Sequence, residues 1–146
     1  MTQDTDSAVR LTRTLDAPRN EVWRMWTDPA EFAAWYGPDG ATVEVTQWEL
    51  YPGGGRLVVM AVETPRGPMT MRFTGEFVEV TEPARLVYTE AMTDGPHSET
   101  RVEVQFQEDG GRTTVELTHH GIPAGSPGET GWAMALDHLA TRTLSA

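Results

Sequence analysis

The side chains best placed for acid–base chemistry in this sequence are Glu90 and His119. Each lies on the apolar side of a segment that alternates apolar and polar residues, Glu90 in line with Tyr88 and His119 in line with Leu117. A buried carboxylate holds a proton more readily, and a neutral imidazole can accept one, so the pair could exchange protons with a bound molecule. On the sequence alone we favour a structural role for each residue over acid–base chemistry. We expect His119 to be a core histidine that bonds a neighbour, and Glu90 to be a carboxylate left in solvent at the end of its strand.

The residues exclude several other kinds of site. The chain has no cysteine and therefore no disulfide and no thiolate nucleophile or metal ligand. His119 and His120 fall on opposite faces of one strand and cannot bind the same metal ion. The run Gly53-Gly54-Gly55 is followed by neither Gly-Lys-Ser/Thr nor a helix, so it predicts a hairpin turn and not a phosphate-binding loop. We expect no metal or cofactor, and we assign no catalytic residue.

The charge of the chain argues against partners that carry phosphate groups. The net charge is −11, and every basic residue is an arginine. A surface with this excess of negative charge repels nucleic acid and anionic membranes. No apolar run approaches the roughly 20 residues that span a bilayer, and residues 1–7 contain no secretory signal. The sequence predicts a soluble, cytoplasmic protein with a flexible N-terminus at 1–7 and one domain at 8–146.

The spacing of apolar residues predicts a strand, two short helices, six strands and a final helix. Residues 9–15 alternate as a half-buried strand does, and Pro18 suits the first turn of a helix. Asp28-Pro29-Ala30-Glu31 predicts a capping box for the second short helix, and Ser126-Pro127-Gly128-Glu129 predicts another for the final helix. The six strands are predicted at 42–49, 56–63, 69–80, 85–92, 99–107 and 112–119, separated by turns such as Asp94-Gly95-Pro96.

These elements predict an α+β fold. A twisted antiparallel sheet with one apolar face requires a cover, and the final helix supplies it through an apolar stripe that contains Trp132 and Leu136. The chain has seven methionines and five tryptophans, and methionine adapts well to the shape of a ligand. Met71 and Phe73 share the strand face opposite Trp132. They line a cavity or fill a solid core, and the sequence leaves both open.

Five groups of segments follow one another along the chain in an order found in one superfamily. They are Asp16-Ala17-Pro18 with Val22-Trp23, Trp35-Tyr36-Gly37-Pro38, Tyr51-Pro52-Gly53-Gly54-Gly55-Arg56, Phe73-Thr74-Gly75-Glu76-Phe77 with Pro83-Ala84-Arg85-Leu86-Val87-Tyr88, and Thr118-His119-His120-Gly121. In this order they resemble the SRPBCC (START-like, Bet v-like) superfamily, in its branch related to the C-terminal domain of the activator of the heat-shock protein 90 ATPase.

The resemblance covers nearly the whole chain and implies a helix-grip fold. In that fold a curved antiparallel sheet of about seven strands surrounds a long C-terminal helix, with two short helices after the first strand. One motif departs from the family, which often carries Asp-x-Arg before its Gly-Gly turn, where this chain has Glu49-Leu50-Tyr51. A charge pair or anionic contact at that position is therefore not carried over.

Members of this superfamily typically enclose a hydrophobic cavity between the sheet and the last helix, so the resemblance implies a small hydrophobic ligand. We expect the ligand to be enclosed by Trp35, Met71, Phe73, Tyr88, Glu90, His119, Trp132 and Leu136.

Two other functions are weighed against ligand binding. An enzyme of cyclase, aromatase or hydrolase type would use Glu90 and His119 in the same cavity, and we favour binding over catalysis. A chaperone partner is not expected, because that role in relatives involves an additional N-terminal domain that this chain lacks. The identity of the ligand and the oligomeric state, a homodimer included, are left open.

Overall fold

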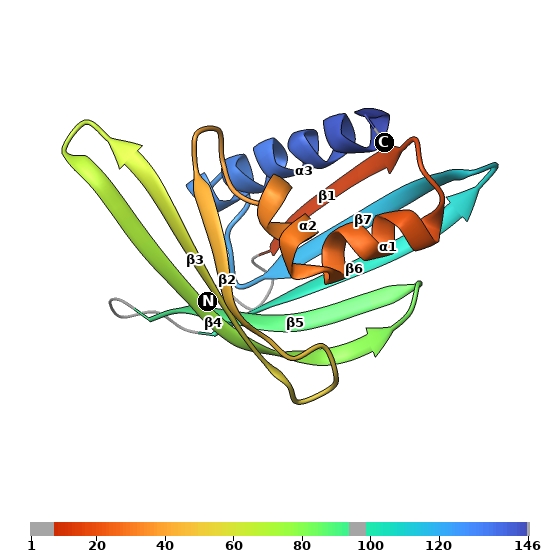
Figure 1. Cartoon of the computed structure of the whole chain (residues 1–146), viewed down its shortest axis with the longest axis horizontal. Coiled ribbons are helices and arrows are strands. Elements are labelled where there is room, and N and C mark those ends of the chain that lie inside the picture. The colour runs from red at the N-terminus through yellow and green to blue at the C-terminus, as the bar shows by residue number, and fades with distance from the viewer. Residues whose placement is uncertain (1–7, 94–98, 146) are drawn as a thin grey trace, which may run out of the picture.

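The computed structural model describes residues 8–93 and 99–145. The N-terminal residues expected to be flexible, 1–7, and the turn predicted at Asp94-Gly95-Pro96 lie outside the described residues. Figure 1 shows a curved sheet with helices packed against its concave side. The predicted α+β helix-grip fold is confirmed.

All seven strands of the sheet pair antiparallel with their neighbours. The strands are β1 (Ala8–Leu15), β2 (Thr42–Trp48), β3 (Gly55–Thr64), β4 (Gly67–Thr81), β5 (Arg85–Met92), β6 (Thr100–Asp109) and β7 (Arg112–His120). Their order in the sheet is β1-β7-β6-β5-β4-β3-β2, so the first strand of the chain lies beside the last. The turn signals in the sequence therefore predicted a meander correctly, whereas the placement of β1 depends on a pairing that spans most of the chain.

Strand β4 contains two features that bend the sheet. Gly75 lies where a Cβ atom would come within 1.9 Å of the carbonyl oxygen of Thr89 on β5, so the two backbones can approach only because this residue has no side chain. The register of β4 against β5 then shifts between Phe77 and Glu79, as a bulge requires. Such irregularities increase the local twist and give the sheet its concave face.

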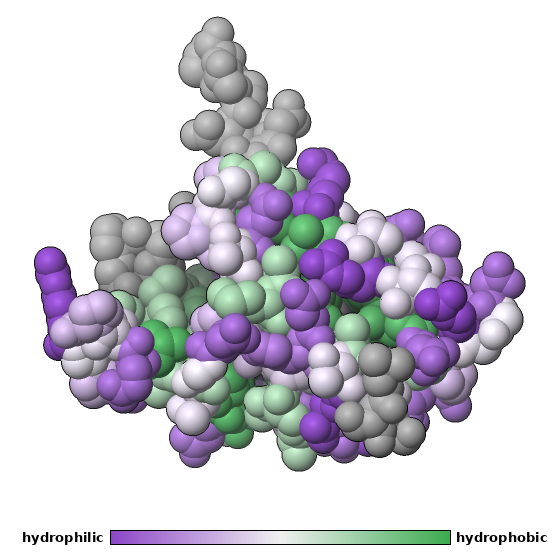
Figure 2. Space-filling view, turned by 90° about the horizontal axis from the view of Figure 1, so that it is seen from above, coloured by the Kyte–Doolittle hydropathy of each residue, from purple (hydrophilic) through white to green (hydrophobic). Residues whose placement is uncertain are grey.

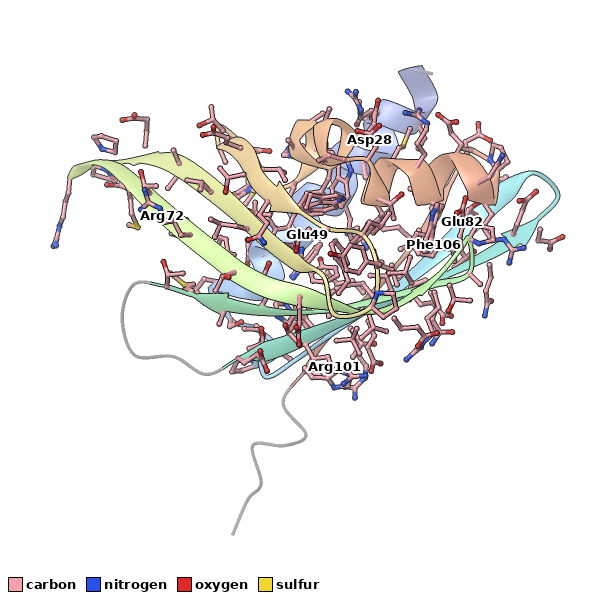
Figure 3. All side chains as sticks on the ribbon, turned by 60° about the horizontal axis from the view of Figure 1, so that its bottom comes forward. Asp28, Glu49, Arg72, Glu82, Arg101 and Phe106 are labelled. Carbon is pink, nitrogen blue, oxygen red and sulfur yellow. The ribbon has the colours of Figure 1, made fainter. Side chains whose placement is uncertain are left out.

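The alternation predicted for the sixth strand is also present. On β6, Phe106 is buried under the helices while Arg101 is exposed on the opposite face of the sheet, as Figure 3 shows. Trp23 and Trp26 pack against the ring of Phe106 from the helical side, with centroids 5.5 and 6.1 Å away. The sheet has one dry and one wet face, as the sequence predicted.

In the described part of the chain, three helices cover the dry face: α1 (Arg19–Thr27), α2 (Pro29–Trp35) and α3 (Pro127–Ser145). The stripe predicted on α3 is confirmed, since Trp132, Leu136 and Leu139 are all buried. Among the residues that the structure describes, no helix is long and apolar enough to cross a membrane. Figure 2 shows hydrophilic side chains spread over the helical side of the molecule, with hydrophobic ones visible between them.

The capping box predicted before α2 is half present, whereas the box predicted before α3 forms neither of its two bonds. The carboxylate of Asp28 accepts hydrogen bonds from the backbone N–H groups of Ala30 (2.9 Å) and Glu31 (3.3 Å), as an N-cap does. The reciprocal bond from the Asp28 N–H to the Glu31 carboxylate is missing. The Asp28 N–H donates instead to the backbone carbonyl of Arg24, in the last turn of α1.

At the start of α3 the predicted cap residue, Ser126, has a hydroxyl without a partner among the described residues. The Ser126 N–H donates to Pro123, so the Glu129 carboxylate accepts from Gly125 (2.7 Å) instead. In both boxes the preceding turn already uses the N–H group that a complete box requires.

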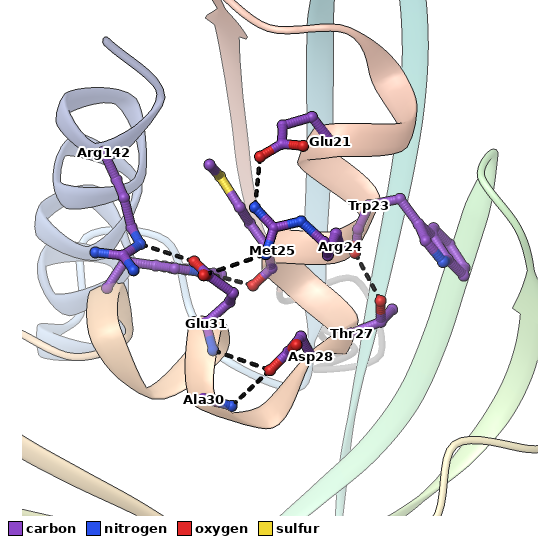
Figure 4. Close-up of polar contacts among 10 residues, drawn as sticks. Glu21, Trp23, Arg24, Met25, Thr27, Asp28, Ala30, Glu31 and Arg142 are labelled. Atoms are coloured by element: carbon purple, nitrogen blue, oxygen red, sulfur yellow. Dashed lines mark hydrogen bonds and ion pairs between the residues drawn. The ribbon is translucent and has the colours of Figure 1, made fainter. Parts of the chain in front are cut away.

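Because the Asp28 N–H does not bond the Glu31 carboxylate, that carboxylate is free to link the helices (Figure 4). It accepts from Arg142 on α3 (2.9 Å) and pairs with Arg24 on α1 (3.2 Å). The Arg142 hydrogen bond, followed by that of Arg24, lowers the pKa of Glu31 below its ordinary value of 4.5. This network fixes the C-terminal half of α3 over α1 and α2.

Candidate functional site

A cavity of about 430 Å³ lies between the sheet and the start of α3, and it is partly open to solvent. Strands β3, β4 and β5 form its floor, and the segment after α2 and the first turns of α3 form its walls. The lining residues are Tyr36, Gly37, Pro38, Met60, Met71, Phe73, Glu90, Met92, Ile122, Pro127, Gly128, Gly131 and Trp132. Its size falls within the range of about 300–1,000 Å³ that is typical of small-molecule sites.

Four of the eight ligand-binding residues expected from the sequence line this cavity: Met71, Phe73, Glu90 and Trp132. The other four, Trp35, Tyr88, His119 and Leu136, are buried and do not line it. Trp35 turns away because its indole N–H donates to the carbonyl of Met25 (2.8 Å). The structure therefore divides the predicted set into a lining group and a group that packs behind it.

The sequence analysis did not include the other lining residues. Met92 follows Glu90 by two positions on the same strand face, a spacing that could have found it. Gly128 and Gly131 have no side chain and thus contribute nothing to a hydrophobic pattern.

The glycines of the cavity wall keep space free. Gly37 has a φ of 98°, which strongly favours glycine, and a Cβ there would lie 3.2 Å from the Met60 methyl group. Gly131 has ordinary helical geometry inside α3, where alanine would be more favourable by about 1 kcal/mol. A Cβ at Gly131 would meet no atom within 4 Å. Because Gly131 lines the cavity, any larger residue would extend into it.

The segment that carries Gly37 and Pro38 is held against α3 by His138. One ring nitrogen, Nδ1, lies 3.3 Å from the carbonyl oxygen of Trp35, and the other, Nε2, lies 2.5 Å from the carboxylate of Asp39. These contacts connect the two walls of the cavity at a point outside its lining.

Glu90 forms the polar end of the cavity, so the prediction that its carboxylate lies in solvent is wrong. The residue is only 5% exposed because Tyr36 and Arg56 cover it. Oxygen Oε2 accepts from the Tyr36 hydroxyl (3.3 Å) and lies 3.4 Å from Nη1 of Arg56. Burial, and then the charge of Glu90, raise the pKa of Tyr36 well above its ordinary value of 10, so the hydroxyl keeps its proton and donates it.

Arg56, which follows the glycine turn, is completely buried in a box of aromatic rings. Its guanidinium carbon lies 4.0 Å from the ring centroid of Tyr88, and the rings of Trp48, Phe32 and Phe77 follow at 5.3, 5.6 and 5.9 Å. A guanidinium over aromatic faces gains cation–π attraction that partly replaces its lost hydration. Arg56 thus supplies a buried charge pair that the sequence analysis did not anticipate.

His119 is a core histidine whose two ring nitrogens are both bonded. The Trp132 indole N–H donates to Nδ1 (2.9 Å), and Nε2 lies 2.7 Å from the hydroxyl of Thr100. Because Nδ1 accepts, the neutral ring carries its hydrogen on Nε2 and donates it to Thr100. Burial is the main cause that lowers the pKa of His119 below 6.5, so this neutral form is favoured at neutral pH.

The two residues of the predicted acid–base pair therefore meet only indirectly. The Thr100 hydroxyl that accepts from His119 donates to the backbone carbonyl of Glu90 (2.9 Å) and does not touch its carboxylate. Trp132 lines the cavity, whereas His119 does not. Within the described part of the chain, no group of three His, Asp or Glu residues could hold a metal ion.

The family of this chain is shown by its sequence. The model of the family described as "Activator of Hsp90 ATPase homolog 1-like protein" matches residues 16–143. The chain belongs to this family. The resemblance to the corresponding branch of the SRPBCC superfamily is thereby confirmed. No curated protein sequence matches the chain significantly.

Solved structures of similar proteins share the helix-grip fold. Protein CV1439 from Chromobacterium violaceum has 25% sequence identity and a TM-score of 0.82, over 92% of this chain and 96% of that chain. A protein from Arthrobacter aurescens has 19% identity and a TM-score of 0.85, over 100% and 91%. The AHSA1 (SPO3351) protein from Silicibacter pomeroyi has 22% identity and a TM-score of 0.78, over 94% and 98%.

Proposed function

We propose that this protein binds a small, largely apolar molecule in the cavity between β3–β5 and the start of α3. The observation that carries the proposal is a cavity of about 430 Å³ whose lining is apolar except at one end, where Glu90 and Tyr36 lie. Burial of an apolar ligand contributes roughly 25 cal/mol per Å² before the cost of association, so the lining supplies affinity and the polar end supplies orientation.

The glycines of α3 support the same proposal. Protein interiors are normally close-packed, and a larger residue at position 131 would both fill space and stabilise the helix. The chain instead keeps Gly131 beside the open volume. A binding site benefits from that space, whereas a purely structural core would not.

Catalysis by the predicted pair receives less support. Both nitrogens of His119 are bonded, to Trp132 and Thr100, and its lowered pKa favours the neutral ring in that arrangement. A general base requires a free acceptor within reach of the substrate. Binding without catalysis therefore remains the function that we propose.

The test is titration with N-phenyl-1-naphthylamine, a neutral dye that fluoresces in apolar surroundings. We expect a saturable increase in fluorescence with the unsubstituted protein. Gly131→Leu places a leucine in the cavity and should weaken the affinity by about tenfold or more, the loss expected when a good apolar site is filled. Because leucine forms helices better than glycine does, the variant should stay folded.

Thr130→Leu is the matched control. Thr130 is the exposed neighbour of Gly131 on the same helix and does not line the cavity, so this variant should bind the dye as the unsubstituted protein does. Equal dye binding by Gly131→Leu and Thr130→Leu, or no binding by the unsubstituted protein, would contradict the proposal.

A further inference from the structure

The polar side chains around the cavity have used their hydrogen-bond donors inside the protein. The Tyr36 hydroxyl donates to Glu90, and the Trp132 indole N–H donates to His119. Tyr36, Glu90 and Trp132 are the lining residues that carry side-chain polar atoms. Since the carboxylate of Glu90 only accepts, these side chains offer acceptors to a ligand and no free donor.

One of those acceptors is unused. Both partners of the Glu90 carboxylate, Tyr36 and Arg56, contact Oε2, and no described residue donates to Oε1. Glu90 is 5% exposed, and the surface it keeps lines the cavity and a smaller adjoining hollow of about 300 Å³. Because Glu90 keeps that surface and Oε1 has no donor among the described residues, Oε1 is an acceptor available to a donor in the cavity.

The positive charge of Arg56 cannot serve a ligand directly. The residue is 0% exposed, and its Nε and Nη2 atoms have no hydrogen-bond partner among the described residues. The ring of Tyr88 lies 4.0 Å from the guanidinium carbon and, with three further rings, encloses it. Arg56 therefore neutralises Glu90 from behind, and a carboxylate ligand in the cavity would meet Glu90 with no accessible cationic side chain in the lining.

We propose that the ligand is an apolar molecule with an uncharged hydroxyl or N–H group, such as a phenol or an alcohol, and that this group donates a hydrogen bond to Oε1 of Glu90. The proposal rests on the proposed function and names the class of its ligand. Anionic amphiphiles such as fatty-acid carboxylates are disfavoured because the lining holds no cationic side chain to balance a second negative charge. Cationic ligands are disfavoured because Arg56 already balances the charge of Glu90, and burial of an unpaired cation is costly.

Three naphthalene derivatives with nearly the same apolar body test this proposal by isothermal titration calorimetry at neutral pH. 2-Naphthol carries a neutral donor, 2-methylnaphthalene carries none, and 2-naphthoate carries an anion. A hydrogen bond to a charged acceptor predicts that 2-naphthol binds about tenfold or more tighter than 2-methylnaphthalene. 2-Naphthoate should bind more weakly than either.

The outcomes separate this inference from the function on which it rests. Equal binding of 2-naphthol and 2-methylnaphthalene, or stronger binding of 2-naphthoate, would overturn the ligand class while leaving an apolar site in place. Failure of all three compounds to bind would overturn the function and the ligand class together.

A variant assigns the preference to Glu90. Glu90→Gln alone leaves Arg56 buried without a counter-ion and is expected to fold poorly. The double variant Glu90→Gln/Arg56→Met removes both charges and keeps a neutral acceptor at position 90. Its preference for 2-naphthol over 2-methylnaphthalene should fall by about threefold or more, because a neutral acceptor bonds more weakly than a charged one.

The measured quantity is the ratio of the affinities for 2-naphthol and 2-methylnaphthalene, so a change of the cavity that weakens both compounds alike does not affect it. An undiminished preference for 2-naphthol in a folded double variant would overturn the role of Glu90.

Discussion

Replacement of Arg56 by methionine tests the importance of burial for the ion pair at the polar end of the cavity. The side chains of Arg56 and Glu90 are 0% and 6% exposed, yet Nη1 and Oε2 are a rather long 3.4 Å apart. The cost of Arg56→Met comes mainly from a carboxylate left buried without a counter-charge. Loss of one partner from a buried pair typically lowers the free energy of unfolding by about 3–5 kcal/mol.

An exposed pair on the same sheet provides the control. Arg85 and Glu79 are closer, with 3.0 Å between Nε and Oε1, but their side chains are 31% and 41% exposed. Water screens such a pair, so Arg85→Met should cost about 1 kcal/mol or less. If burial determines the cost, the longer pair is the more expensive one to break.

Urea unfolding at neutral pH measures both variants, with a comparison of midpoints at equal slope. The double variant Glu90→Gln/Arg56→Met should be more stable than Arg56→Met alone, because it removes the unpaired charge. A cost for Arg56→Met as small as that for Arg85→Met would refute this reasoning, and so would a double variant whose cost equals the sum of the single ones.

Three further predictions concern stability. Gly131→Ala should raise the free energy of unfolding by about 0.5–1 kcal/mol in urea, because the added methyl group favours the helix and meets no atom within 4 Å; a loss of stability would show that the space is already filled. Since burial lowers the pKa of His119, the unfolded chain binds a proton that the native chain does not, so stability should fall as the pH falls through about 6.5. His119→Phe should remove that part of the slope, and an unchanged slope would contradict the assignment. The pKa of Glu31 is lowered chiefly by Arg142, so its contribution is present above pH 4.5 and lost as the pH falls further; Glu31→Gln should flatten the acid limb of the stability curve, and an unaltered acid limb would count against the network.

The elements of this fold could be predicted because their signals are local. Alternation along β6 and the proline and glycine punctuation of the hairpins depend on neighbouring residues, and the structure reproduces them. The capping boxes show the limit of such reasoning. Asp28 and Ser126 have the required residue types, but the preceding turns already use the N–H groups that complete boxes would need.

The site was only partly predictable because it depends on contacts between distant segments. Strand parity correctly directed Glu90 inward, but parity cannot show that Arg56 from another strand would cover it. The same rule directed His119 inward without revealing that Trp132 would occupy its nitrogen. Gly131 illustrates a further difficulty, because a residue that matters through the absence of a side chain leaves no trace in a hydrophobic pattern.

The central claim of an apolar binding cavity is tested most directly by the NMR signals of the methionine methyl groups during a titration with N-phenyl-1-naphthylamine. Met60, Met71 and Met92 line the cavity, whereas Met25 is buried in the core and Met69 is 49% exposed, so the last two are internal controls. We predict saturable shifts of the three lining methyl groups with little change at Met25 and Met69. Shifts confined to Met69, or no saturable shift at Met60, Met71 and Met92, would contradict the claim.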